Sequence, residues 1–281
     1  LYLEIFMKLF ICTTPMQLFL ACRIIEEMNL SASKVQIFYI STVNNKVVAN
    51  NLEHARIFSH KVSHLIISSK FSRFSNLYFI LIYKMFFFKK YNSIYVASID
   101  NIYVHFILTY TKFNKLFTFD DGTANIFNES TYYVGDKYRS NLYRTWNKVR
   151  YGMLRISYSM SKVKKESLLH YSIYDNFPNI IDNVYHINLL KNNNDIIINK
   201  GICSRKKSCN IMLGGAYFDL FGSEDKIKLY TGRCFDYLKN TNEPNYYIPH
   251  PRNLFAIETH GINIINTDNI AELEISKLLE E

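Results

Sequence analysis

Two short stretches of the chain end in side chains that could handle a proton. Asp120 and Asp121 follow an apolar run at residues 117–119, and His250 follows a second apolar run at residues 246–248. A carboxylate accepts protons, and a histidine can donate or accept one near neutral pH. Each stretch alone also fits an ordinary loop, since Asp-Gly is a common turn sequence. Ligands of open α/β sheets bind beyond the carboxyl ends of the strands, so the two stretches are candidate halves of one site.

The first part of the chain alternates between predicted strands and helices. Thr14 is a good helix N-cap, Pro15 suits the first helical position, and Gln17 completes a capping box. Met7 is the expected natural start, and the residues after it could also be interpreted as a secretory signal peptide. The capping pattern favours a strand, a turn and a helix instead. Strand and helix in alternation predict an α/β fold with a parallel, doubly wound sheet. Strands are expected at residues 8–12, 35–40, 93–97 and 115–119, with a helix at 102–110.

A change in composition divides the chain in two. The Asn-rich stretch at residues 191–200 predicts a boundary between a first lobe, 1–190, and a second lobe, 191–281. In the second lobe a short strand runs into Gly214 and Gly215. A helix is expected after Ser223, with Ile227, Tyr230, Cys234 and Leu238 on its apolar face. The remaining elements are expected at residues 210–213, 246–248 and 262–265 for strands and from 269 for a final helix.

Net charge indicates which partners the protein could bind, and cysteine spacing indicates which covalent or metal sites it could form. The net charge of +9 favours anionic partners, such as nucleic acid, acidic lipid headgroups or a nucleotide-linked substrate. No dense Lys/Arg run lies in a nucleic-acid-binding motif, which disfavours DNA or RNA. The five cysteines lack C-x-x-C spacing, which argues against a disulfide framework and a zinc site. His60 and His64 could bind a metal on a helix, but no carboxylate accompanies them, so surface histidines are the favoured interpretation.

Residues 77–88 form the most hydrophobic stretch of the chain, and Lys89 and Lys90 follow it. This stretch is too short to span a bilayer. Two interpretations remain open for it. It could be a buried helix packed on the sheet, or an aromatic and basic surface that lies against an anionic leaflet.

Four motifs, in this order, resemble the bacterial lipooligosaccharide sialyltransferases of glycosyltransferase family 52. They are Cys-Thr-Thr-Pro-Met-Gln at residues 12–17, Phe-Asp-Asp-Gly-Thr-Ala-Asn at 119–125, Met-Leu-Gly-Gly at 212–215 and Tyr-Tyr-Ile-Pro-His-Pro-Arg at 246–252. The similarity covers nearly the whole chain from Met7. The Asp-Asp-Gly and His-Pro elements are shared with other bacterial sialyltransferase families, so they point to the activity class more than to one acceptor.

The resemblance implies a GT-B fold of two Rossmann-like lobes, with the acceptor held by residues 1–190 and the nucleotide-sugar donor by residues 191–281. It implies an enzyme that moves sialic acid from CMP-sialic acid to a terminal galactose of lipooligosaccharide or a similar surface glycan. It also implies that no metal or other cofactor is needed and that the protein can form a homodimer. The expected location is cytoplasmic, with peripheral contact at the inner membrane.

The resemblance also implies roles for individual residues in an inverting displacement. Asp120 or Asp121 is the expected base; neighbouring side chains at a strand end point opposite ways, so the other one orients the base or holds the loop. His250 is expected to stabilise the leaving CMP phosphate through a charge-assisted hydrogen bond. The expected donor-binding residues are Gly214, Gly215, Pro249, Pro251 and Arg252. The expected acceptor-side loop residues are Thr14, Pro15, Gln17, Gly122, Thr123 and Asn125.

One departure from the family pattern concerns the end of the sequence. Family members carry a Ser-rich segment that follows the His-Pro motif and holds the CMP phosphate. After His250 the only hydroxyl side chains are those of Thr259, Thr267 and Ser276, and none of them is part of a pair. We therefore expect the second lobe to be incomplete at its C-terminal end. The alternatives are a same-fold glycosyltransferase with another sugar nucleotide and an inactive, truncated remnant.

Overall fold

The computed structural model divides the chain into two compact units, Leu1–Leu189 and Leu190–Glu281. We call them unit 1 and unit 2 and describe each by itself. The described residues are 7–42, 44–67, 90–189, 209–215, 217, 221–241, 243–250 and 261–280. The hydrophobic stretch at 77–88 lies outside these residues, so both interpretations of it remain predictions. In the described part of the chain, no helix is both long and apolar enough to cross a membrane.

Unit 1 is built around one parallel sheet of seven strands, in a Rossmann-like α/β arrangement. The sheet has the order β3-β2-β1-β4-β5-β6-β7, and every neighbouring pair runs in parallel. The order changes direction between β1 and β4, which makes that point the topological switch where ligands of such sheets bind. The strands are β1 Lys8–Cys12, β2 Val35–Ser41, β3 Lys61–Ile66, β4 Tyr91–Val96, β5 Phe113–Phe119, β6 Ser167–Ser172 and β7 Val184–His186.

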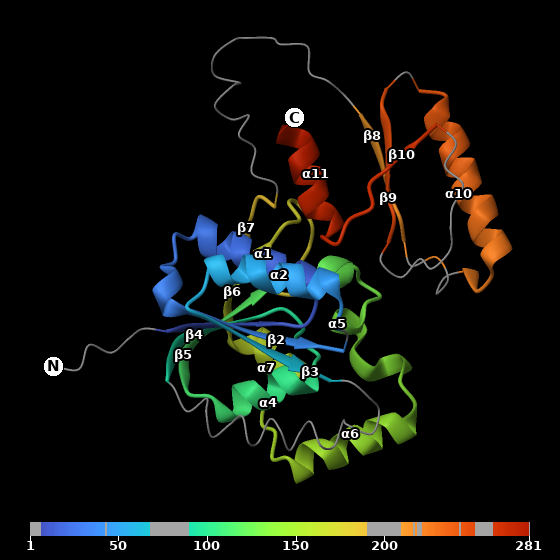
Figure 1. Ribbon diagram of the computed structural model, residues 1–281. Coiled ribbons are helices and arrows are strands. Elements are labelled where there is room, and N and C mark those ends of the chain that lie inside the picture. Colours follow the sequence, from blue (N-terminus) through green and yellow to red (C-terminus); the bar gives the residue numbers. More distant parts are fainter. Residues whose placement is uncertain are drawn as a thin grey trace. The chain divides into compact units, whose positions relative to one another are not determined.

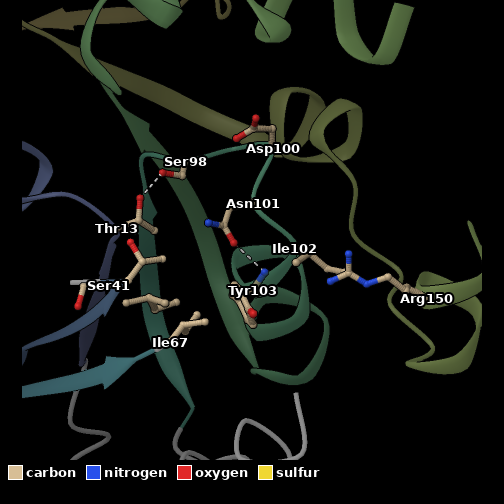
Figure 2. Close-up of a pocket in the computed structure, with 11 residues that line it drawn as sticks. Thr13, Ser41, Ile67, Ser98, Asp100, Asn101, Ile102, Tyr103 and Arg150 are labelled. Carbon is tan, nitrogen blue, oxygen red and sulfur yellow. Dashed lines mark hydrogen bonds between the residues drawn. The ribbon is translucent and has the colours of Figure 1, made fainter. Parts of the chain in front are cut away.

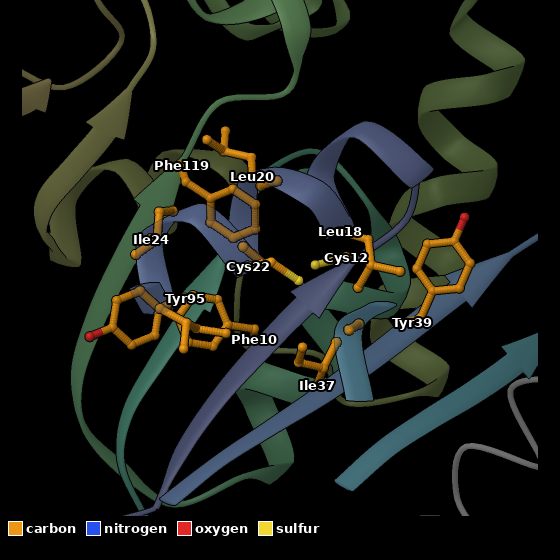
Figure 3. Close-up of a cluster of buried hydrophobic side chains, with 14 of the residues drawn as sticks. Phe10, Cys12, Leu18, Leu20, Cys22, Ile24, Ile37, Tyr39, Tyr95 and Phe119 are labelled. Carbon is orange, nitrogen blue, oxygen red and sulfur yellow. The ribbon is translucent and has the colours of Figure 1, made fainter. Parts of the chain in front are cut away.

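Helices cover both faces of this sheet, as Figure 1 shows. Alternate residues of a strand point to opposite faces, and β1 is apolar on both. Leu9 and Ile11 pack with α4 on one side, whereas Phe10 and Cys12 pack with α1 and α2 on the other. Figure 3 shows the second of these cores. The helices of unit 1 are α1 Pro15–Glu27, α2 Lys46–Ile57, α4 Ile102–Tyr110, α5 Thr131–Val134, α6 Asn141–Met153 and α7 Met160–Glu166.

The start of α1 follows the predicted capping pattern with one change. Thr14 is the N-cap, its hydroxyl oxygen accepts a hydrogen bond from the Gln17 backbone N–H at 3.2 Å, and Pro15 opens the helix. A capping box would return the Gln17 side chain to the Thr14 backbone N–H. Instead, Gln17 Oε1 accepts from the backbone N–H of Thr13, one residue earlier, at 2.6 Å. The side chain can then reach beyond the helix to other strand ends.

His60 and His64, for which the sequence favours surface or capping positions over a metal-binding pair, do not lie on a helix. His64 lies within strand β3, so the i, i+4 spacing from His60 does not bring the two rings onto one helical face. The imidazole Nε2 of His64 lies 2.7 Å from Ser41 Oγ of β2. Among the residues that the structure describes, no three His, Cys, Asp or Glu side chains gather closely enough to hold a metal ion.

Unit 2 contains a parallel sheet of three strands in the order β10-β9-β8. Its core joins Phe235, Tyr247 and Ile262, and the Phe235 and Tyr247 rings meet edge to face at 5.2 Å. The strands lie where the apolar runs predict them. The elements of unit 2 are β8 Asn210–Leu213, α10 Glu224–Lys239, β9 Asn245–Ile248, β10 Asn263–Ile264 and α11 Ala271–Glu280.

The apolar face predicted for α10 is rotated by one residue. Ile227 is buried as expected, but its buried companions are Thr231 and Phe235, whereas Tyr230 is exposed and Cys234 only half-buried. Thr231 can be buried because its hydroxyl donates to the Ile227 carbonyl at 2.8 Å, within the same helix. The predicted apolar face does not include Thr231, since a polar side chain is buried only where it finds such a partner.

Candidate active site

The polar residues of unit 1 that could do chemistry lie at the carboxyl ends of three neighbouring strands. Thr13 follows β1, Ser98 follows β4, and Asp120 and Asp121 follow β5. These ends meet at the switch point of the sheet. The structure therefore brings the Asp-Asp-Gly motif and the motif at residues 12–17 to one edge, as the strand alternation predicts.

Asp120 is a buried anchor of the strand end. The residue is 2% exposed. One oxygen, Oδ1, accepts a hydrogen bond from His170 Nε2 at 2.9 Å. The other, Oδ2, accepts from Ser172 Oγ at 2.9 Å and from the Ile173 backbone N–H at 2.7 Å. With every contact directed at β6 and the loop after it, Asp120 joins two strands and cannot reach solvent.

Asp121 points the other way and keeps part of its surface exposed. Its Oδ1 accepts from Gln17 Nε2 at 2.5 Å, and its Oδ2 accepts from the Tyr132 hydroxyl at 2.6 Å. Burial, and then the charges of Asp121 and Asp100, raise the pKa of Tyr132 far above the usual range. Tyr132 therefore stays protonated and acts as a fixed donor to the carboxylate.

Gln17 is the residue that connects the three strand ends. Its Oε1 accepts from Thr13, while its Nε2 donates both to Ser98 Oγ at 2.9 Å and to Asp121. Ser98 and Thr13 close the ring, with 2.6 Å between their hydroxyl oxygens. The amide is almost fully buried, so this network holds Asp121 in one orientation.

The loop after the aspartates is a short 3-10 turn, Gly122–Asn125. Gly122 has φ of 56°, a left-handed conformation that strains any residue with a Cβ. Asn125 is fully buried, and its Oδ1 accepts from the Asp121 backbone N–H at 2.7 Å. Asn125 thus shapes the loop from within, while Gly122 and Thr123 are exposed at its surface.

A pocket of about 440 Å³ opens beside this network, as shown in Figure 2. Thr13 and Ser98 belong both to the wall of the pocket and to the Gln17 network. Gln17 therefore links these two wall residues to Asp121. Most of the polar lining consists of hydroxyl groups, with one acid, Asp100, and one base, Arg150. The full lining is Thr13, Ile40, Ser41, Thr42, Ile67, Ser98, Asp100, Asn101, Ile102, Tyr103 and Arg150.

Asp100 carries the clearest electrostatic perturbation in the pocket. Its side chain is open to the cavity, yet surrounding protein atoms and the nearby charge of Asp121 raise the pKa of its carboxyl group. The sequence analysis did not identify Asp100, Ser98 or Arg150. Ser98 and Asp100 could have been found as polar residues directly after a predicted strand, but nothing in the sequence pairs Arg150 with them.

In unit 2, Gly214 lies between two strand ends. A Cβ at this position would be 2.5 Å from the His250 backbone nitrogen and 2.9 Å from the Tyr247 hydroxyl oxygen. The glycine thus lets β8 approach the His250 segment, and its N–H donates to the Ile248 carbonyl at 2.8 Å. At Gly215 a Cβ would be 2.9 Å from the Tyr217 ring. Contact of the two glycines with a nucleotide remains a prediction.

His250 and Pro249 follow β9 and are half-buried. Pro251 and Arg252 lie outside the described residues, so their expected roles remain predictions. On the acceptor side, Thr14 is exposed and Pro15 half-buried at the start of α1. Of the expected acceptor-side residues, Gln17 and Asn125 contact Asp121 directly.

Comparison with known proteins gives the family. The sequence model of the family described as glycosyltransferase family 52 matches residues 32–281. A protein of Pasteurella multocida (strain Pm70), named CMP-N-acetylneuraminate:beta-galactoside alpha-2,3-sialyltransferase, is 32% identical over 274 residues, which cover 95% of this chain and 79% of that protein.

Two further relatives are both named N-acetyllactosaminide alpha-2,3-sialyltransferase. The protein of Haemophilus influenzae is 26% identical, over 68% of this chain and 56% of its own length. The protein of Neisseria meningitidis serogroup A is 26% identical, over 65% of this chain and 45% of its own length. The match to these two relatives therefore spans only about half of their length. The family match over most of the chain shows that this protein belongs to glycosyltransferase family 52.

Proposed function

We propose that this protein transfers sialic acid from CMP-sialic acid to the terminal galactose of lipooligosaccharide or a similar surface glycan. The observation that carries the proposal is the 32% identity, across 95% of the chain, to a relative whose name gives this donor and a β-galactoside acceptor. The names of the three relatives agree on an α-2,3 linkage, and we propose the same linkage here.

The pocket of unit 1 suits the acceptor. Its volume of about 440 Å³ falls in the range of small-molecule sites, and its hydroxyl groups can hydrogen-bond the hydroxyls of a sugar. Asp121 is anchored by two residues of the pocket wall through Gln17. Asp121 does not itself line the pocket, and we propose that a galactose bound there extends its reacting hydroxyl to this carboxylate.

The reaction is an inverting displacement at the anomeric carbon of sialic acid. The galactose hydroxyl oxygen forms a bond to that carbon while the bond to the CMP phosphate oxygen breaks. The hydroxyl proton passes to the Asp121 carboxylate, and the bonding electron pair leaves with the phosphate. Proton transfer to a positioned base contributes roughly 10²–10⁴-fold in rate.

Asp121 suits the base better than Asp120. Both oxygens of Asp120 are committed to buried donors, so Asp120 serves to hold the strand end. Asp121 is partly exposed, and its two hydrogen bonds come from a neutral amide and a neutral phenol. These donors orient the carboxylate, and neither of them carries a charge.

Unit 2 supplies the donor side of the proposal. His250, following β9, would hydrogen-bond the phosphate that carries the developing charge, and Pro249 and Pro251 would stiffen the backbone around it. Arg252 would bind the phosphate or the carboxylate of sialic acid. These groups provide the positive charge that the leaving phosphate requires, so we propose that the reaction needs no metal ion. We also propose that the two units are the lobes of a GT-B enzyme. This enzyme works at the cytoplasmic face of the inner membrane.

The test is CMP release from CMP-sialic acid, with and without lactose as the acceptor. We expect lactose to stimulate release, and we expect Asp121→Asn to lower kcat by about 10²–10⁴-fold with CMP affinity unchanged. Asp136→Asn, a change at an exposed carboxylate of the same unit, serves as the matched control. Asp120→Asn should instead reduce stability, by about 3 kcal/mol, because its amide N–H₂ would replace one of two accepting oxygens and would face either His170 or the Ser172 and Ile173 donors.

The same assay separates the alternatives. Wild-type turnover in folded Asp121→Asn would refute the base assignment. Release from another sugar nucleotide alone would favour a different donor. No release from any donor by the folded protein, with no CMP binding, would favour an inactive remnant.

A further inference from the structure

Helix α6 presents an apolar stripe to solvent. Leu142, Trp146, Val149 and Met153 are 81%, 50%, 44% and 68% exposed, and no residue of α6 is fully buried. At 3.6 residues per turn these four positions fall within about 60° of one another around the helix. The stripe is therefore a continuous surface that turns large apolar side chains to water.

The opposite part of α6 attaches the helix to unit 1. The Tyr151 hydroxyl lies 2.6 Å from Nδ1 of the buried His105 in α4. The Leu154 carbonyl, at the end of α6, accepts a hydrogen bond from the Tyr110 hydroxyl at 2.6 Å. Tyr151 and Leu154 are half-buried, so the orientation of the helix, with its stripe outward, is set by the contacts beneath it. Figure 1 shows α6 at the periphery of unit 1.

The charge around the stripe has one sign. Between residues 137 and 165 the sequence holds nine Lys or Arg and no Asp or Glu, equal to the net charge of +9 of the whole chain. Lys148 and Arg150, on either side of Val149, lie about 100° from it in opposite directions around α6. The stripe is thus bordered by positive charge on both flanks, by Lys148 and by Arg150, which also lines the pocket, and the exposed Arg155 follows the end of the helix.

We propose that α6 is a docking surface for a bilayer with anionic headgroups. The apolar stripe lies in the interface between headgroups and acyl chains, and the lysine and arginine side chains extend to the lipid phosphates. An indole at the centre of the stripe suits this depth, since tryptophan prefers the membrane interface. This surface belongs to residues 141–153, and the proposal does not use residues 77–88.

The positive charge beside the stripe favours a membrane over a second copy of the chain as the partner that covers it. A two-fold contact would place the same patch on both subunits, so the basic residues of one helix would face those of the other. Like charges at such a contact oppose association, whereas an anionic leaflet neutralises them.

The experiment uses the full chain and the fact that Trp146 is the only tryptophan. Vesicles of 30% phosphatidylglycerol in phosphatidylcholine are added, and Trp146 emission is followed beside co-sedimentation. We expect a blue shift with these vesicles, quenching by brominated acyl chains, and little binding to pure phosphatidylcholine. No sugar nucleotide or acceptor is present, so the result is independent of the proposed enzyme activity.

Two double variants test the two components. Lys148→Gln with Arg155→Gln should lower the partition coefficient about 30-fold, since each cation near an anionic surface contributes about tenfold or less. Leu142→Asn with Met153→Gln should lower it on the order of 100-fold. The matched controls change exposed residues of α10: Lys226→Gln with Arg233→Gln for charge, and Leu229→Asn for the apolar surface.

Circular dichroism and lactose turnover check that the variants fold. Binding of equal strength to neutral and anionic vesicles would overturn the proposal, as would unchanged binding in both folded double variants. If the stripe variant instead converts a dimer to a monomer by light scattering, and wild-type protein does not bind vesicles, the stripe is covered by a second copy and the proposal is wrong.

Discussion

Replacing Gln17 by glutamate would test the assignment of Asp121 as the base. The amide nitrogen of Gln17 donates to Asp121 Oδ1 at 2.5 Å. In Gln17→Glu a second carboxylate oxygen takes the place of this donor, so two acidic groups face each other at hydrogen-bond distance. Two such groups hold one proton between them, and the pKa for the loss of that proton rises.

The size of the shift follows from the contact. An oxygen separation of 2.5 Å places the centres of the two carboxylates about 4 Å apart, where like charges repel by about 4 kcal/mol at an effective dielectric constant of 20. This energy corresponds to roughly three pKa units. Because Asp121 is partly exposed, solvent screens part of the repulsion, and we expect a rise of about one to two units.

The assay is the pH dependence of kcat/KM with CMP-sialic acid and lactose. A base must be deprotonated, so activity is lost as the pH falls through its pKa, and a raised pKa moves this acidic limb to higher pH. We expect the limb of Gln17→Glu to move up by about one to two pH units. Gln17→Met removes the same hydrogen bonds without adding a charge, so it should lower kcat and move the limb by less than Gln17→Glu does.

A control for net charge is Asn141→Asp, at an exposed position of α6. An acidic limb that stays in place in folded Gln17→Glu, with turnover close to wild type, would refute the reasoning. Either Asp121 would then not be the base, or its contact with Gln17 would not govern its ionisation.

Two further predictions concern stability. Gly214→Ala places a Cβ 2.5 Å from the His250 backbone nitrogen, so we expect a loss of about 1–3 kcal/mol in urea unfolding and weaker CMP binding. Burial lowers the pKa of His105 to about 4, below its unfolded value near 6.5, so the stability that neutral His105 provides is lost as the pH falls between these values. The loss should reach about 3 kcal/mol at pH 4 in urea titrations, and His105→Gln should remove this part of the pH dependence.

Each of these predictions has a matched control. For Gly214→Ala the control is Gly232→Ala in α10, where a Cβ meets nothing within 4 Å; equal stability and CMP affinity in both variants would contradict the close approach of the strand ends. For His105→Gln the control is His60→Gln, at an exposed histidine. If the pH dependence of His105→Gln matches that of wild type, the buried histidine does not contribute to acid unfolding.

The sequence predicts elements well where an apolar run ends in a sharp polar turn. The strands at Lys8–Cys12 and Asn210–Leu213 and the helix at Ile102–Tyr110 agree with prediction to the residue. Each is bounded by turn formers or a helix cap that local chemistry makes unambiguous. Local patterns fail where a polar group finds a partner within its own helix, as at Thr231.

The candidate site could be predicted in its composition but not in its contacts. The sequence places both aspartates at a strand end, yet their contacts differ because β6 lies beside β5 and takes the side chain of Asp120. Gln17 and Asp121 are 104 residues apart in the chain, so their contact depends on the strand order. The hydrophobic periodicity of the sequence does not indicate the order of the strands in the sheet.

The strand order of unit 1 also has a consequence for the synthesis of the protein. β1 is made before the other six strands of this sheet, yet it lies in the interior of the sheet between β2 and β4. About 80 residues separate the end of β1 at Cys12 from the start of β4 at Tyr91, which takes roughly 4–16 s at translation rates of 5–20 residues per second. Through that interval one edge of an apolar strand has no neighbour, and the duration of this aggregation-prone state is set by the ribosome and not by the folding reaction.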